Sequence, residues 1–517
     1  MNPRPNILLI TTDQQRWDTL SLHGQPGYRT PVLDGLAANG LCFDRAYCPS
    51  PISTPSRVSM LTGRYPSSHG AYTIGSTPEF HDPTLPGELS RHGYRTAIVG
   101  KTHFTSRRVE AKHTAGRLHP GLDEADPPES FWRQYDGPYL GFDFVRVGWG
   151  HTNERLPSEH YRAWLAARGA NLDRFHNNHP VEPPRSPEEG KEVISTGCWS
   201  NMPEELHQTA WITEETLGFV ERQQAAGRPW FCWTSYKDPH FPFVCPEPFY
   251  GAVDMSEVRT HALTPGEFDD KPPFYKRYHE SGAWHDGRRD FYDGQSVPAC
   301  RRNKWVEPRT DMQAYIGMCN MLDAYVGRIA RRLERLGALE HTLLVFTSDH
   351  GEYFGHHGLW GKGLPAYEDV HRVPCVVHWP AGTRGAKKGR TRALFNLVDL
   401  AQTFLEAAGV PAPPGMQGVS QLPVLRGEAA RAREDTIVEC HATPHVYQQS
   451  YVTERHKLVV YRDAPYGELY DLEADPEQME NLWDRPAHAG LRAELMQRFV
   501  QANMRKDGTL PPRVWGA

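Results

Sequence analysis

Four short apolar runs along the chain end in polar or ionisable residues. They read NILLITTDQ from residue 6, YRTAIVGKTHF from residue 94, PWFCWTSYKDPHF from residue 229 and TLLVFTSDHGE from residue 342. Many of their apolar positions are β-branched or aromatic, which is typical of strands buried on both faces. Because the carboxyl ends of parallel strands meet at one edge of a sheet, the pattern predicts an α/β fold in which these polar clusters converge.

Two longer segments have helical spacing. Between residues 311 and 337, apolar residues recur every three or four positions and predict an amphipathic helix with Gly337 as its C-cap. The apolar positions are Met312, Tyr315, Ile316, Cys319, Leu322, Val326, Ile329 and Leu333. The stretch LFNLVDLAQTFLEAAGVP, from residue 394, predicts a second helix that closes at Gly409 and Pro411.

A shorter helix is predicted within SPISTPSRVSMLTGRYP, residues 50–66. Thr54 suits its N-cap and Pro55 its first position. The N-terminus of a helix favours anions, and Ser53 stands one residue outside that end, with Arg57 four residues further on. Taken alone, the segment is an ordinary capped helix, so the role of Ser53 depends on the rest of the chain.

The remaining segments complete the predicted architecture. Residues 105–203 and 255–305 are rich in Pro, Gly, His, Arg and Trp with weak periodicity, which is typical of loop insertions over a scaffold. Insertions of this size often mediate contacts between copies, so a homo-oligomer is one expectation. From about residue 434 the pattern alternates like antiparallel strands, and a helix is expected from Ala487. We therefore predict a catalytic domain over residues 1–433, with a large mixed, mainly parallel sheet flanked by helices, and a small α+β subdomain over residues 434–517.

Charge and cysteine content narrow the class of protein. The 517 residues carry 57 Lys and Arg against 63 Asp and Glu, a formal charge of -6 with no long run of either sign, which disfavours nucleic acid or a lipid surface as the main partner. The chain starts without a basic region followed by a long apolar core, and no apolar run reaches membrane-spanning length. Its nine cysteines are dispersed, without CxxC pairs, as expected of free thiols. A cytoplasmic enzyme is the expectation, although a removed leader stays open.

Ionisable residues follow nearly every predicted strand. Asp13-Gln14 and Asp349-His350 offer two carboxylates, an amide oxygen and an imidazole, a plausible donor set for a divalent cation. The other such residues are Lys101, His103, His240 and Lys362. A metal beside lysine and arginine suits an oxyanion with spread charge, sulfate or phosphate, and the histidines suit proton transfer. Each residue alone is weak evidence; their recurrence at strand ends carries the prediction.

Seven segments together resemble the type I sulfatases of the alkaline phosphatase superfamily. They are NILLITTDQ, STPSRVSMLTGRYP, GYRTAIVGKTHF, DPHFPF, FTSDHGEYFGHHGLWGKG, RVPCVVHWPAG and ELYDLEADPEQMENL, in family order over residues 6–482. The resemblance implies an alkaline-phosphatase-like sandwich fold. It also implies that residue 53, the first of the STPSR motif, is oxidised to formylglycine, whose hydrate attacks sulfur in this family. Ser53 is therefore expected to be the nucleophile after modification.

The resemblance also assigns roles to individual residues. The metal would be held by Asp13, Gln14, residue 53, Asp349 and His350. Arg57 would hold the hydrate, and Lys101 and His103 would serve the nucleophile side. His240 and Lys362 would serve the leaving-group oxygen.

Two departures from the commonest family pattern matter. Gln14 and His350 stand where many members have Asp and Asn, a pairing that resembles phosphonate monoester hydrolases and choline-sulfatase-like enzymes. Calcium is the family default, but an imidazole ligand favours manganese or magnesium. Ser53 replaces the usual cysteine, and in this family serine is converted only by oxygen-independent radical maturases of the cytoplasm. An engineered Cys→Ser replacement that traps substrate is the other explanation for Ser53.

The sequence thus predicts a metal-dependent hydrolase of sulfate esters, acting on a sulfated carbohydrate or a small organic sulfate. The alternatives are a phosphonate or phosphate-diester hydrolase on the same scaffold, a phosphoesterase with Ser53 as direct nucleophile, and an inactive sulfate-binding form with unmodified Ser53. Residues of the insertions could bind a carbohydrate or only pack loops: Trp132, Tyr135, Tyr139, His151, His160 and Arg162. His371 is a further pocket candidate without an assigned role.

Overall fold

The structure is a computed structural model of the chain. It describes residues 4–74, 76, 83–105, 129–148, 159–171, 197–199, 202–261, 263–276, 308–441 and 446–507. His151 and most of the two predicted insertions lie outside these residues.

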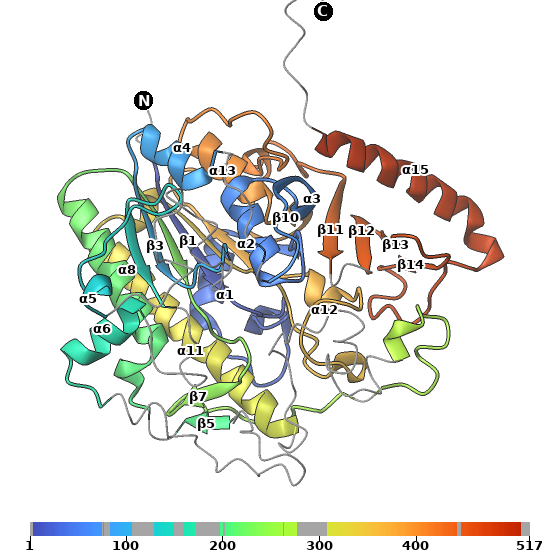
Figure 1. Ribbon diagram of the computed structural model, residues 1–517, viewed down its shortest axis with the longest axis horizontal. Coiled ribbons are helices and arrows are strands. Elements are labelled where there is room, and N and C mark those ends of the chain that lie inside the picture. The colour runs from blue at the N-terminus through green and yellow to red at the C-terminus, as the bar shows by residue number, and fades with distance from the viewer. Residues whose placement is uncertain are drawn as a thin grey trace, which may run out of the picture.

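An eight-stranded sheet forms the centre of the molecule, in the order β10-β2-β9-β8-β1-β6-β3-β4 (Figure 1). The strands are β1 Asn6–Thr12, β2 Leu41–Tyr47, β3 Arg95–Gly100, β4 Phe144–Val147, β6 Trp230–Ser235, β8 Thr342–Ser348, β9 Cys375–His378 and β10 Gly389–Asn396. β1 pairs in parallel with β6 and β8, and β3 with β4 and β6. β10 is parallel to β2, whereas β9 is antiparallel to both β2 and β8. The predicted mixed, mainly parallel sheet is confirmed.

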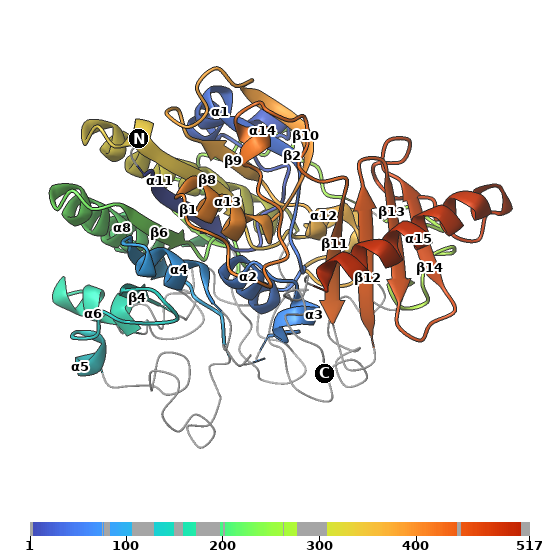
Figure 2. The ribbon, with the colours of Figure 1, turned by 90° about the horizontal axis from the view of Figure 1, so that it is seen from above.

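Helices cover both faces of this sheet (Figure 2). Alternate residues of a strand point to opposite faces, so Ile7 and Leu9 join one core and Leu8 and Ile10 the other. The first core is closed by α2 Ser53–Thr62, α4 Leu85–Arg91, α13 Asp399–Ala407 and α14 Leu422–Leu425. The second is closed by α1 Pro31–Asn39, α6 Glu159–Ala167, α8 Gln208–Ala225 and α11 Pro308–Arg335.

The two long predicted helices differ in outcome. α11 has the predicted apolar stripe, all of it buried, and Gly337 beyond its end has a positive φ of 65°. The second segment is helical only as α13, because Leu394 and Phe395 pair with β2 as part of β10. The helical prediction for residues 394–396 is therefore wrong, since pairing with a distant strand overrides local spacing.

The C-terminal part forms a separate antiparallel sheet. Its strands are β11 Asp435–His441, β12 Tyr447–Thr453, β13 His456–Tyr461 and β14 Gly467–Asp471. α15 Ala489–Lys506 packs across this sheet through Leu495, Phe499 and Ala502 (Figure 2). The predicted strands and helix are present, and the domain boundary at residue 434 stays a prediction. Glu439 N–H donates to the Pro49 carbonyl (2.8 Å), so this sheet contacts the segment that leads into Ser53.

Shorter elements complete the described chain. They are α3 Pro66–His69, α5 Glu129–Trp132, α12 Glu368–His371, β5 Gly197–Trp199 paired with β7 Val244–Pro246, and 3₁₀ turns at Ser21–His23, Glu204–Leu206, Leu339–His341, His356–Gly358 and Pro486–His488. Among the described residues, no helix has the length and hydropathy that crossing a bilayer requires. The eight cysteines in this part of the chain are free thiols, as predicted.

Candidate active site

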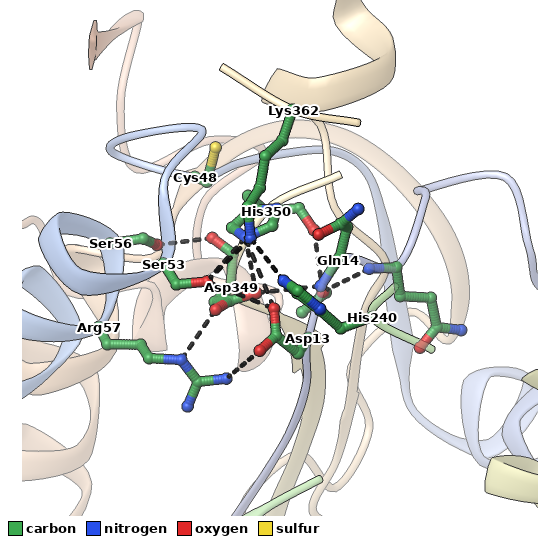
Figure 3. Close-up of polar contacts among 12 residues, drawn as sticks. Asp13, Gln14, Cys48, Ser53, Ser56, Arg57, His240, Asp349, His350 and Lys362 are labelled. Carbon is green, nitrogen blue, oxygen red and sulfur yellow. Dashed lines mark hydrogen bonds and ion pairs between the residues drawn. The ribbon is translucent and has the colours of Figure 1, made fainter. Parts of the chain in front are cut away.

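Side chains from the ends of several strands meet at one point of the central sheet (Figure 3). Asp13 follows β1, Asp349 and His350 follow β8, Lys101 follows β3 and His240 lies beyond β6. Ser53 enters from α2 and Lys362 from the loop beyond β8. The predicted convergence of these residues is therefore present in the structure.

Ser53 lies at the centre of the group and is fully buried. Its Oγ is 2.9 Å from His350 Nε2, 3.3 Å from Asp13 Oδ1 and 3.4 Å from Lys362 Nζ. The predicted N-cap is wrong by two residues: Ile52 is the N-cap, and its carbonyl accepts the first helical bond from Ser56 N–H (3.1 Å). Pro55 then sits in the first turn, where its missing N–H has no helical partner to lose, and Ser53 becomes the first helical residue.

Two buried carboxylates are bridged by Arg57. Its Nε donates to Asp349 Oδ2 (2.8 Å) and its Nη2 lies 3.8 Å from Asp13 Oδ2. The remaining Nη1 donates to Ser235 Oγ (2.8 Å) and to the Lys101 carbonyl (3.2 Å). This fork fixes both carboxylates beside Ser53.

Lys101 supplies a second cation to one of these carboxylates, Asp13. Its Nζ pairs with Asp13 Oδ2. Burial raises the pKa of Asp13, but Lys101 and the other cations of the site hold it well below its usual range. Burial lowers the pKa of Lys101, and its like-charged neighbours Arg57 and Lys362 add to this shift against the attraction of Asp13. Asp13 is therefore a carboxylate at neutral pH.

The hydrogen bonds of His350 settle its tautomer. Its Nδ1 faces the Gly351 carbonyl at 2.9 Å, and since a carbonyl only accepts, Nδ1 carries the proton. Burial lowers the pKa of His350 to about 4, so the ring is neutral and Nε2 presents a lone pair toward Ser53. Nε2 lies 3.6 Å from both Asp13 Oδ1 and Asp349 Oδ1. This is the form of histidine that binds a metal.

The donor set fits a divalent cation. Ligand atoms of Asp13, Asp349 and His350 all lie within 4.8 Å of one another. Gln14 Oε1 is buried and has no hydrogen-bond partner among the residues that the structure describes, which suits an oxygen that binds a metal. Gln14 also has a positive φ of 64°, a strained conformation that Gln14 N–H stabilises by donating to Asp349 Oδ1 (3.1 Å).

Lys362 and His240 form a hydrogen-bonded pair near Ser53. The His240 Nδ1 donates to the Phe241 carbonyl, so its Nε2 is the acceptor. Lys362 Nζ donates to that Nε2 (3.0 Å) and lies equally close to His350 Nε2. Figure 3 shows Lys362 directed at both His240 and His350.

His103 belongs to the same cluster but lies at its edge. It is half-buried and has a positive φ of 55°. Burial and the charge of Lys101 hold the pKa of His103 well below its usual range, so its ring is neutral at pH 7.

The aromatic residues of the first insertion pack among themselves. His160 accepts from Val147 N–H (3.0 Å), donates to the Tyr135 carbonyl (2.7 Å) and contacts the ring of Trp132 edge-on at 5.1 Å. Tyr139 is buried in the first core. These contacts favour loop packing for Trp132, Tyr135, Tyr139 and His160.

His371 and the group formed by His23, Cys42 and Asp44 are less suited to a functional role. His371 is fully buried, and burial keeps its pKa well below the usual range. His23, Cys42 and Asp44 also lie within ligand distance of one another, but Arg390 Nε donates to Asp44 (2.8 Å), and its charge disfavours a cation there.

Sequence reasoning missed two polar residues that hold the site. Ser235, at the end of β6, accepts from Arg57, and Glu352, three residues after Asp349, accepts from Gln14 Nε2. Ser235 is the last residue of the apolar run PWFCWTS, and Glu352 is the last residue of DHGE, which follows the run TLLVFTS. In both places, nearby ionisable residues are the stronger candidates for a site.

A buried nucleophile candidate beside a divalent-metal donor set and several cations defines a hydrolase of oxyanion esters. The sulfatase family profile matches residues 5–410, and the profile of the N-sulphoglucosamine sulphohydrolase C-terminal region matches residues 355–505. The chain belongs to the sulfatase family and is a sulfuric ester hydrolase.

Three known proteins illustrate the relationship. An arylsulfatase of Clostridium perfringens is 27% identical over 489 residues, 93% of this chain and 90% of that protein. An N-acetylglucosamine-6-O-sulfatase of Bacteroides thetaiotaomicron is 27% identical over 506 residues, 96% of this chain and 85% of that protein. The crystal structure of a phosphonate monoester hydrolase of Agrobacterium radiobacter superposes with a TM-score of 0.76 at 25% identity, over 97% of this chain and 96% of that one. These likenesses confirm the predicted fold class and the predicted class of reaction.

Proposed function

We propose that the cluster around Ser53 is the active site, and that residue 53 is the nucleophile after oxidation to formylglycine. The observation that carries this proposal is the position of Ser53 Oγ, within 3.4 Å of His350, Asp13 and Lys362. The substrate is a sulfate ester of a carbohydrate or a small organic alcohol, in line with relatives named for aryl sulfates and for N-acetylglucosamine 6-O-sulfate.

The chain's own residues prepare the site for an anion. Arg57, Lys101 and Lys362 place three cations around two carboxylates, so the group attracts a sulfate. When residue 53 is formylglycine, its hydrate supplies one hydroxyl that attacks sulfur and a second that later allows release of sulfate. Asp13 Oδ1 and the lone pair of His350 Nε2 face the oxygen of residue 53 and orient it.

A divalent cation would be held by Asp13, Gln14, Asp349 and His350, together with residue 53. It would supply Lewis-acid stabilisation of the sulfate oxygens and a lower pKa for the nucleophile. Calcium is the expected ion. Manganese and magnesium are the alternatives, because His350 contributes an imidazole ligand. We further propose that a radical maturase converts Ser53 and that this conversion takes place in the cytoplasm.

Two different groups serve the two proton transfers, one at the leaving group and one at the nucleophile. The proton that Lys362 holds against His240 Nε2 is positioned for a leaving alkoxide. His103, neutral and beside Lys101, serves the nucleophile side.

Hydrolysis of phosphonate monoesters or phosphate diesters is the second candidate function. The observation that favours it is the presence of Gln14 Oε1 and His350 as candidate metal donors, together with the fold likeness to the phosphonate monoester hydrolase.

Paired rates separate the two functions. The enzyme is co-expressed with a radical maturase, and kcat/KM is measured on a nitrophenyl sulfate and a nitrophenyl phosphonate, with Ser53→Ala as the matched background. The proposal expects the larger kcat/KM on the sulfate and loss of both activities in Ser53→Ala. A sulfate rate no higher than that of Ser53→Ala, beside a fast phosphonate rate, would establish the second function instead.

A further inference from the structure

The loop that carries Lys362 has an unusual backbone. Between Glu352 and Pro365 it has only a single 3₁₀ turn, and much of it is in the left-handed region. Positive φ values occur at Phe354 (57°), Gly355 (87°), His357 (57°), Gly358 (66°), Gly361 (88°) and Gly363 (97°). Non-glycine residues adopt this region only when surrounding contacts enforce it, so the position of Lys362 depends on side chains that hold the loop.

Glu352 is one such side chain, and it is fully buried. Its Oε1 accepts from Phe354 N–H (3.1 Å) and from Gly361 N–H, so a single oxygen joins the start of the loop to the residue before Lys362. Its other oxygen, Oε2, accepts from Gln14 Nε2. The carboxylate therefore contacts the Lys362 loop and the candidate metal ligand at the same time.

The contact with Glu352 also fixes which way the Gln14 amide points. Gln14 Nε2 donates to Glu352 Oε2, so the NH₂ end of the amide faces the carboxyl group. Gln14 Oε1 is then directed away from Glu352, and it is the oxygen that has no hydrogen-bond partner among the described residues. Without Glu352, the amide could rotate and present a donor where a cation needs an oxygen.

We propose that Glu352 is a positioning residue that couples the metal site to the leaving-group side, through Gln14 at one oxygen and the Lys362 loop at the other. This inference rests on the proposed function, because the roles of Gln14 and Lys362 belong to it. Metal binding should order the loop, and an ordered loop should strengthen metal binding, because such coupling is reciprocal.

Glu352→Gln tests this with the smallest change in shape. A glutamine has one accepting oxygen, so it can satisfy either Gln14 or the two loop N–H groups, but not both. Glu468→Gln is the matched control, because Glu468 is equally buried and accepts from the hydroxyls of Tyr275, Tyr461 and Tyr470 in and beside the C-terminal sheet. Both variants replace a fully buried carboxyl group by an amide, and only Glu352→Gln changes a contact of the candidate metal ligand Gln14.

The first readout is binding of Mn²⁺ and Ca²⁺ to the full-length protein by calorimetry, which needs no conversion of residue 53. We expect Glu352→Gln to weaken binding about 10–100-fold, the range typical of partners that orient metal ligands, and Glu468→Gln to leave it unchanged. The second readout is kcat/KM on sulfates with good and poor leaving groups. Glu352→Gln should lose more on poor leaving groups, because Lys362 is displaced.

A folded Glu352→Gln variant with unchanged metal affinity and an unchanged leaving-group profile would overturn the inference. Where that variant does not fold, hydrogen exchange of wild-type residues 353–364 with and without Mn²⁺ is the test. Slower exchange with the metal supports the coupling, and equal exchange overturns it. If the wild type neither binds metal nor cleaves sulfate esters, the proposed function fails; if it does both and only the coupling is absent, this inference alone fails.

Discussion

The pair formed by His240 and Lys362 gives the sharpest prediction about mechanism. Lys362 Nζ lies 3.0 Å from His240 Nε2 and donates a hydrogen bond to it, because the His240 Nδ1 donates to the Phe241 carbonyl. We therefore expect the two side chains to act as one proton donor. Removing either one, as His240→Ala or Lys362→Met, should remove the same step.

The expected size of the effect follows from general-acid catalysis. Each single variant should lose about 10²–10⁴ in kcat/KM on alkyl or sugar sulfates, which is about 2.7–5.5 kcal/mol of transition-state stabilisation. Independent effects would multiply in the double variant. Because the two groups share one proton, we expect the double variant to lose no more than about tenfold beyond the worse single variant.

The assay is a series of sulfate esters whose leaving groups span nitrophenol to a sugar hydroxyl. Nitrophenyl sulfates, whose phenolate leaves without a proton, should lose little in either variant. His103→Ala serves as the comparison, and it should slow good and poor leaving groups by similar factors. Equal losses of His240→Ala across the series, or a multiplied loss in the double variant, would refute the shared-proton reasoning.

Three other changes probe the metal, the carboxylate fork and the stability of the loop. Asp349→Ala should abolish metal binding and activity together, because one anionic ligand is lost; stoichiometric metal retained by the variant, measured by elemental analysis, would contradict this. Ser235→Ala removes an acceptor of the charged Arg57 and should lower the free energy of unfolding by about 1.5–3 kcal/mol in urea titration, whereas an unchanged midpoint would show that water replaces the hydroxyl. Burial lowers the pKa of His357, but its bonds to two buried carboxylates outweigh this and raise that pKa to about 9 from an ordinary 6.5. The stability gained from protonated His357, on the order of 3 kcal/mol, is therefore full below pH 6.5 and is lost as the pH rises through about 9. His357→Gln should flatten the melting temperature across this window, and an unchanged slope would assign the proton to another group.

The fold and the central residues could be predicted because their signals are local and repeated. The apolar runs mark buried strands, and the rule that parallel strands end at one edge brings Asp13, Lys101 and Asp349 together. The stripe of α11 follows from its three-and-four spacing alone.

Other features depend on contacts between distant parts of the chain. Leu394 and Phe395 fit a helical pattern, but they pair with β2, more than 300 residues earlier in the chain, and so form part of a strand. The N-cap of α2 is Ile52, and Ser53, the first helical residue, contacts Asp13 and His350 from distant strand ends. No sequence pattern reports such pairings.

The protonation of the histidines could not be read from the sequence either. The neutral tautomer of His350 depends on one backbone carbonyl, and the acceptor role of His240 depends on another. The oxygen of Gln14 is oriented by Glu352, whose place in the chain suggests nothing more than a loop carboxylate.

The chemical state of residue 53 decides whether formylglycine is the nucleophile of this enzyme. The tryptic peptide of residues 46–57 contains Ser53, and its mass distinguishes serine from formylglycine, which is lighter by two hydrogen atoms. Protein from cells with and without a radical maturase is compared by peptide mass and by sulfate-ester turnover. We expect activity to rise in proportion to the formylglycine fraction and to be absent from protein that holds only serine. Full activity in protein whose peptide shows only serine would contradict this expectation.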